Sequence, residues 1–341
     1  MSKLKEIIGN YIRIKSKPSR RLISWVKTFK GSLTLLCLLG LFALPLLTDN
    51  PYYLGIFINA AIFSIFAASW NFLGGYTGQV SFGHAIFLGM GGYITASLVR
   101  YFNVAWSISL IVGGLFSVLI AFFIGIICLR LKGPYLALGT MALGLFTMAL
   151  FNNELLGTAS DWLFFGSQGI DRVPRISRDV VEIFYVYLII MIVSVIIMIL
   201  IGDSKMGTIF KSIRDDDTGA EASGINLTKY KVIAFMISGF FAGIAGGLLA
   251  MQSRNVAPAF FQPLYSFYAI IMTAIGGIGL ISGSVLGGFI FFGLEALLSD
   301  VWDPVFLFSI ILILIIRFAE MGLLRPVLEH LRDLWDLVLG K

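Results

Sequence analysis

Charged residues are scarce in this sequence. Asp, Glu, Lys and Arg make up 13% of its 341 residues, about half the roughly 25% that is usual in soluble proteins. Apolar residues reach 58% and the mean hydropathy is +0.93, and the few charges gather in short segments between apolar runs. No polar block is long enough to bury a core of its own, so the composition excludes a soluble globular domain and predicts one membrane domain.

Cysteine and histidine are also rare, with two residues of each. Cys37 and Cys128 lie in apolar runs, so they offer neither a disulfide framework nor a paired metal motif. A membrane serine hydrolase would need a histidine base beside its serine, but Ser81 and His84 lie three residues apart in one segment and His330 lies in the C-terminal tail. The sequence therefore predicts no enzyme, and no metal or cofactor bound by this chain.

The N-terminal segment carries much of the positive charge. Nine of the 25 basic residues precede the first apolar run, in a chain of formal net charge +6. They are Lys3, Lys5, Arg13, Lys15, Lys17, Arg20, Arg21, Lys27 and Lys30. Such a flank is expected on the cytoplasmic side of a membrane protein and suits anionic lipid headgroups, so nucleic acid is not expected as a partner.

A secretory signal peptide is the alternative interpretation of this end, because a basic stretch precedes the apolar run 33–47. The basic part is long, however, and no clear small-residue cleavage site follows the run. Asp49-Asn50-Pro51 leads at once into another apolar run. An uncleaved first span fits these features better.

Ten apolar windows have the length of about 20 residues that crosses a membrane. They lie near 32–48, 52–73, 78–99, 104–129, 134–151, 181–202, 230–252, 264–280, 283–299 and 304–319. They lack the alternation that barrel strands show over about ten residues, which favours helices. The predicted fold class is an all-α integral membrane protein of about ten transmembrane helices, or eight or nine if a glycine-rich segment is re-entrant.

The charges agree with ten spans and with N- and C-termini on the cytoplasmic side. In that topology Arg130, Lys132 and the connection 203–231 fall on the side of the basic N-terminus, as short basic loops should, and the connection 152–180 falls outside. We therefore expect a basic cytoplasmic segment over 1–31, a transmembrane domain over 32–319 and a cytoplasmic tail over 320–341.

A polar, glycine-rich break, GGYTGQVSFGH, separates two apolar runs at 74–84. Non-helical backbone at membrane depth is tolerated only where it is buried in protein or lines a water-filled cavity, and polar residues there suggest function. The sequence predicts a translocation pathway, or a helix break beside one, at Gly78, Gln79, Ser81, Gly83 and His84. Two alternatives stay open: a cytoplasmic turn in which Gln79 and Ser81 cap the next helix, and a hydrogen-bonded packing role for His84.

The connection 203–231 contains a dense charge run around DDDTGAEASG. Thr218 and Glu221 have the spacing of a capping box, and Gly224 is placed to end a helix in the left-handed conformation. The pattern predicts a short helix outside the membrane, with a solvated linker as the alternative. Residues 202–208 resemble a phosphate-binding loop only superficially, because the required lysine does not follow the second glycine.

Four motifs of this sequence resemble the permease subunits of branched-chain amino-acid ABC importers, in particular the LivM type. They are YTGQVSFGHA at 76–85 with GGY at 91–93, RLKGPYLAL at 130–138, AIGGIG at 274–279 with GSVLG at 283–287, and IRDD…AEASGIN within 213–226. The resemblance covers roughly 50–325. The segment 166–170 matches only loosely, and 317–324 lacks the proline that usually follows the arginine.

The last of these motifs is similar to the family's coupling-helix loop, which docks into a cleft of the ATPase subunit. The resemblance assigns coupling to Arg214, Asp215, Asp216, Thr218, Glu221 and Gly224. It also implies a bacterial inner-membrane location, a homologous permease subunit that completes a heterodimer, two ABC ATPase subunits that hold ATP and Mg²⁺, and an external solute-binding protein. Alternating access is the implied mechanism.

Three other functions stay open at this stage. An importer of urea or short amides would share these motifs. An ion-coupled secondary transporter would need membrane carboxylates, for which Glu295 is the candidate. A membrane scaffold would not need the polar break at 74–84.

Overall fold

The computed structural model describes residues 39–128, 131, 133–152, 166–298, 310 and 313. The chain divides into two units, residues 1–49 with 327–341 and residues 50–326. The first unit contributes a helix over 39–47. The elements of the second unit are α4 (Pro51–Thr77), α5 (Ala85–Arg100), α6 (Trp106–Cys128), α7 (Pro134–Phe151), β1 (Ile170–Asp171), α9 (Val180–Gly202), α10 (Lys205–Asp215), α11 (Asp217–Ala222), α12 (Leu227–Ser253), β2 (Asn255–Val256), η1 (Pro258–Phe261), α13 (Pro263–Gly276) and α14 (Ile281–Leu298).

Six of these helices are long and apolar enough to cross a membrane: α4, α6, α7, α9, α12 and α14. Helices α6, α7 and α9 expose many large apolar side chains, which suits contact with lipid rather than water. The prediction of an all-α, multi-pass membrane protein is confirmed. The count of ten spans stays a prediction, because parts of the first and last expected spans, 32–48 and 304–319, lie outside the described residues.

Helix α4 is the centre of the second unit. It packs against α9, α12, α13 and α14, and nearly every residue from Ile58 to Thr77 is buried. Asn50 starts the helix by accepting a hydrogen bond from the Tyr52 amide at 3.0 Å, with Pro51 in the first turn. Gly78 ends it in the left-handed conformation, at φ 70°.

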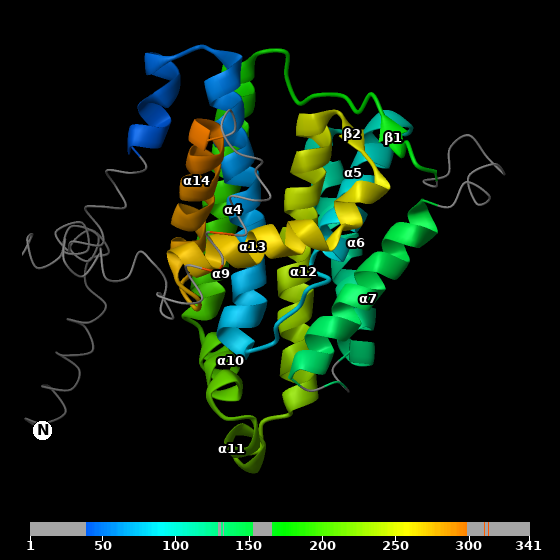
Figure 1. Cartoon of the computed structure of the whole chain (residues 1–341), viewed down its shortest axis with the longest axis vertical. Coiled ribbons are helices and arrows are strands. Elements are labelled where there is room, and N and C mark those ends of the chain that lie inside the picture. Colours follow the sequence, from blue (N-terminus) through cyan, green and yellow to red (C-terminus); the bar gives the residue numbers. More distant parts are fainter. Residues whose placement is uncertain are drawn as a thin grey trace, which may run out of the picture. The chain divides into compact units, whose positions relative to one another are not determined.

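Two expected spans have the wrong limits, and both errors fall at glycine-rich breaks. The span expected at 78–99 becomes helical only at Ala85. The span expected at 264–280 is helical only to Gly276, and the 14 residues of α13 extend about 21 Å, short of the roughly 30 Å hydrocarbon layer. Figure 1 shows α13 lying across α4 and α12 instead of along them. Hydropathy windows average over such breaks, so they do not show where the helix stops.

The second unit has two distinct ends. The C-terminal end of α9 leads into α10 and α11, and α12 starts from the same place. At the opposite ends of α9 and α12, β1 pairs with β2 in antiparallel register, with Ile170 opposite Val256 (Figure 1). The connection predicted at 203–231, between two spans, thus contains two short helices, α10 and α11, at one end of the bundle.

Candidate functional site

The break predicted at 74–84 is a non-helical segment that runs from Gly78 to His84, between α4 and α5. Ser81, Gly83 and His84 are buried, Gln79 is half-buried and Gly78 is exposed. The segment therefore passes from the surface into the interior of the second unit. Its polar backbone groups need partners there, because lipid offers none.

Three other helices supply those partners. The Trp70 indole of α4 donates to the Ser81 carbonyl at 2.8 Å, and the Phe82 amide donates to the Thr140 hydroxyl of α7 at 3.1 Å. The first amide of α5, from Ala85, donates to the Ser266 hydroxyl of α13 at 2.9 Å. Helix α5 is therefore capped from α13, and the alternative in which Gln79 and Ser81 cap it is wrong.

Gly83 is required by this packing. A Cβ atom there would overlap the backbone carbonyl of Thr140, so α7 can approach the segment only because the position lacks a side chain. Gln79, by contrast, donates to the nearby Thr77 carbonyl at 3.2 Å. The break is thus tightly enclosed at Gly83 and more accessible at Gln79.

His84 is fully buried, with its Nε2 atom 2.9 Å from the hydroxyl of Ser69. The Ser69 hydroxyl also donates to the Phe66 carbonyl at 2.7 Å, an arrangement that favours a proton on Nε2. The Nδ1 atom has no hydrogen-bond partner among the described residues. With its ring between Phe66 and Phe87, His84 holds the start of α5 against α4.

A second break, between α13 and α14, is held by Asn71 of α4. Asn71 is fully buried and accepts a hydrogen bond from the Gly279 amide at 2.8 Å. Its side-chain nitrogen donates to the Leu280 carbonyl at 2.9 Å and to the Ser284 hydroxyl at 2.8 Å. One amide side chain thus holds the break and the first turn of α14. The sequence predicted an uninterrupted span over 264–280, and nothing in it identified Asn71 as a partner of this break.

The predicted coupling residues lie on α10, on α11 and in the turns that follow these two helices. Helix α10 packs through Phe210 against Phe72 of α4 and Tyr230 of α12. Asp215, Asp216, Thr218, Glu221 and Gly224 are all exposed beyond that contact. The structure therefore brings these residues together on a projecting segment at the end of the bundle.

The N-terminal cap of α11 differs from the predicted one. Asp216, and not Thr218, is the cap residue: its carboxylate accepts from the Thr218 amide at 3.0 Å and from the Thr218 hydroxyl at 2.6 Å. The hydroxyl of Thr218 and the backbone of Gly219 hold the pKa of the Asp216 carboxyl below its ordinary value. Asp216 and Thr218 are both residue types that cap helices. Asp216 is the cap because its backbone is extended and separates α10 from α11.

The C-terminal end of α11 agrees with the prediction. Gly224 has φ +83°, its amide donates to the Glu221 carbonyl at 2.9 Å, and the Ile225 amide donates to the Ala220 carbonyl at 3.1 Å. These two bonds form a Schellman motif. Lys231 of α12 then pairs with Asp217 at 2.6 Å, which fixes α11 to the start of α12.

Arg214 connects the projecting segment to the interior. Its guanidinium donates to the Gly75 carbonyl at the end of α4, at 3.0 Å, and also pairs with Asp215 at 2.8 Å. Gly75 in turn touches both Asn71 and Gly279, so closely that a Cβ atom would overlap them. A movement of α10 can therefore reach the break between α13 and α14 through one side chain. The sequence motif included Arg214 but gave no sign of this contact.

The opposite end of the molecule carries a cluster of arginines. Arg175, Arg178 and Arg254 line a groove of about 510 Å³ beside β1 and β2, and all three are exposed. No ion pair involves them within the described residues. The neighbouring acidic groups have local partners instead, since Asp171 accepts a hydrogen bond from Asn255 and Glu182 accepts one from Ser177. These arginines give the surface a positive charge, and the sequence analysis did not identify it.

The family model described as "Branched-chain amino acid transport system / permease component" matches residues 52–319. The high-affinity branched-chain amino acid transport system permease protein LivM of Salmonella typhimurium is 27% identical over 249 residues. LivM of Escherichia coli is 26% identical over 249 residues. Each alignment covers 64% of this chain and 57% of the relative.

A shorter match is to the probable branched-chain amino acid transport permease protein LivH of Methanocaldococcus jannaschii. It is 30% identical over 111 residues, which is 31% of this chain and 35% of the relative. The chain therefore spans less than two thirds of the length of the relatives that it matches. No solved structure gives a significant match.

Proposed function

The chain belongs to the family of permease components of branched-chain amino acid transport systems, and on that premise we propose that it forms part of the translocation pathway of an ATP-driven importer of branched-chain amino acids. A homologous permease completes the pathway, and two separate ATPase subunits hold ATP and Mg²⁺ and drive alternating access. An external binding protein delivers the substrate. The location is a bacterial inner membrane, with α10 and α11 on the cytoplasmic side.

The contact between Arg214 and Gly75 is the observation that carries this proposal. A permease without its own ATPase must receive the energy of hydrolysis mechanically, at an exposed surface that is connected to its transmembrane helices. The segment 215–224 is such a surface, and the 3.0 Å bond from Arg214 to the Gly75 carbonyl is its connection. Closure of the ATPases would displace α11, and Arg214 would transmit the displacement to the break around Gly279.

The arginine groove supports the binding-protein part of the proposal. Basic residues in short loops are usually retained on the cytoplasmic side. With α10 and α11 on that side, Arg175, Arg178 and Arg254 lie at the external ends of α9 and α12, where basic residues are less common. An acidic surface of a delivered binding protein would compensate their charge.

Co-purification tests the assembly. The full-length protein, extracted from its own membranes in mild detergent, should retain an ATPase and a second permease. Glu221→Ala should lose the ATPase while the protein stays folded, because Glu221 is exposed on α11. Glu182→Gln, an exposed change at the other end of the molecule, is the matched control and should retain the complex. Recovery of the protein alone, in both wild type and control, would contradict the proposal.

Uptake into vesicles tests the substrate and the energy source. We expect ATP-dependent uptake of leucine, isoleucine or valine that persists when an ionophore collapses the proton gradient. ATP-dependent uptake of urea or acetamide instead would show that the substrate differs while the mechanism is the proposed one. Uptake that follows the ion gradient and needs no ATP would replace the mechanism itself, and Glu295 would then be the first residue to change.

A further inference from the structure

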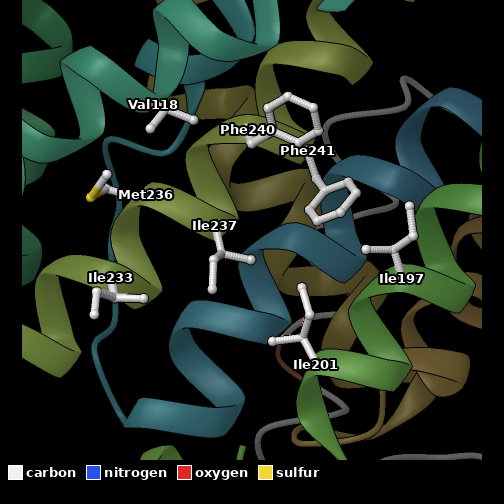
Figure 2. Close-up of a pocket in the computed structure, with 8 residues that line it drawn as sticks. All are labelled: Val118, Ile197, Ile201, Ile233, Met236, Ile237, Phe240 and Phe241. Atoms are coloured by element: carbon white, nitrogen blue, oxygen red, sulfur yellow. The ribbon is translucent and has the colours of Figure 1, made fainter. Parts of the chain in front are cut away.

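An apolar groove of about 360 Å³ runs along the second unit between α9 and α12. Both helices pack against α4, which separates them and leaves the groove between. In Figure 2 the side chains of α12 and α9 flank the groove, with Val118 of α6 beside those of α12. The side chains that carry the argument are Val118, Ile197, Ile201, Ile233, Met236 and Phe240.

The lining suits a flexible hydrocarbon chain better than a helix. Transmembrane helices pack closely where small residues such as glycine, alanine and serine let the backbones approach. The eight residues around this groove are all large and apolar, and none is small. A second helix would be held at a distance by these side chains, whereas an acyl chain can follow the spaces between them.

Lys229 lies at one end of the side of α12 that lines the groove. Lys229, Ile233, Met236 and Phe240 follow one another at intervals of three or four residues along α12, so they share one side of the helix. Lys229 is exposed, and its ammonium has no ion pair within the described part of the chain, since Asp217 pairs with Lys231 instead.

The dimensions match one leaflet of a bilayer. Phe240 lies 11 residues after Lys229 on α12, a rise of about 16 Å along a helix, close to half of the roughly 30 Å hydrocarbon thickness. The groove therefore lies at the depth of acyl chains, and Lys229 lies at the depth of the headgroups of the leaflet beside α10 and α11.

We propose that this groove binds one anionic phospholipid, with an acyl chain between α9 and α12 and the phosphate on Lys229. The bound lipid would brace the start of α12, where Lys231 and Asp217 fix α11. Neither the transported substrate nor the ATPase is needed for this site, so it stands independently of the proposed function.

Photolabelling of the full-length protein in phosphatidylcholine nanodiscs tests the site. The probe is phosphatidylglycerol with a diazirine on one acyl chain. We expect labels in α9 near 197–201 and in α12 near 233–240, competed by unlabelled phosphatidylglycerol and not by added phosphatidylcholine. Lys229→Gln should reduce the labelling about fivefold, the factor expected for one basic residue at an anionic lipid surface. Lys211→Gln removes a cation at the same end of the molecule, outside the groove, and should leave the labelling unchanged.

Met236→Trp should block the groove and abolish these labels, whereas Leu200→Trp should not. Leu200 is 65% exposed and lies next to Ile201 on α9 without lining the groove, so it controls for added bulk at the same depth. If Met236→Trp fails to fold, the exposed Lys229→Gln still tests the site. Labels that spread over α7 and over parts of α6 away from Val118, or equal competition by phosphatidylcholine, would overturn the proposal. Crosslinks from the groove to a second polypeptide would overturn it in favour of a subunit interface.

Discussion

The two breaks inside the bundle and the projecting segment at its end are held together in opposite ways. The breaks at 78–84 and 277–280 are closed by distant side chains, since Ser266 caps α5 and Asn71 binds Gly279 and Leu280. The segment 215–224 is held almost wholly by local bonds, such as those of Asp216 with Thr218. The interior is therefore sensitive to single substitutions, whereas the projecting segment can lose a side chain and keep its fold.

Asn71→Ala should have the largest effect on stability. It removes three hydrogen bonds, with the Gly279 amide, the Leu280 carbonyl and the Ser284 hydroxyl, and each bond contributes about 0.5–1.5 kcal/mol. We expect a loss of about 1.5–4.5 kcal/mol, measured as a lower midpoint of thermal unfolding in detergent. Asn59→Ala, a half-buried amide on the same helix, is the control. Equal midpoints for the two variants would show that the second break does not depend on Asn71.

Gly83→Ala should come next. Its Cβ would overlap the Thr140 carbonyl, and such overpacking costs about 1–3 kcal/mol. The midpoint of thermal unfolding should fall, and amide exchange at the start of α5 should rise. Gly55→Ala, in open space on α4, should neither lower the midpoint nor raise the exchange at α5. An unchanged exchange rate at α5 in Gly83→Ala would contradict the tight contact with α7.

The acid sensitivity of α11 should be smaller and purely local. The pKa of Asp216 is lower in the folded protein than its ordinary 3.8, so its stabilising contribution is fully present above that ordinary value. It is lost as the pH falls through the lower folded pKa. The protection of the α11 amides against hydrogen exchange, relative to the intrinsic rate at each pH, should therefore fall as the pH drops below 3.8, with α12 unaffected. Asp216→Asn should remove most of this pH dependence, and a variant that keeps it in full would assign the effect to another group.

The sequence predicted the segments whose determinants are local. Apolar windows located α4, α6, α9 and α12, and Gly224 marked the end of α11 because its left-handed conformation depends on its own backbone. The cap at Thr218 was wrong only by the choice between two adjacent candidates. The expected spans at 78–99 and 264–280 failed in their limits because their ends depend on Thr140, Ser266 and Asn71, which lie far away in the sequence.

The same distinction applies to the candidate site. The break at 74–84 and the coupling segment were visible as polar and charged interruptions of an apolar chain. The bond from Arg214 to Gly75 joins residues 139 positions apart, and the groove of Arg175, Arg178 and Arg254 assembles only when β1 pairs with β2. Such contacts exist only in the folded chain. The predictions for 1–31 and 320–341, and for Arg130 and Lys132, fall outside the described residues.

The central claim is that Arg214 transmits the movement of the projecting segment to the transmembrane helices. The most direct test is the ratio of amino acid uptake to ATP hydrolysis in proteoliposomes that contain the purified complex, for wild type, Arg214→Ala and the control Lys205→Ala, an exposed cation on the same helix. We predict that Arg214→Ala retains the ATPase subunits and hydrolyses ATP but loses most of its uptake, while the control keeps the wild-type ratio. An Arg214→Ala complex that transports with the wild-type ratio would contradict the account.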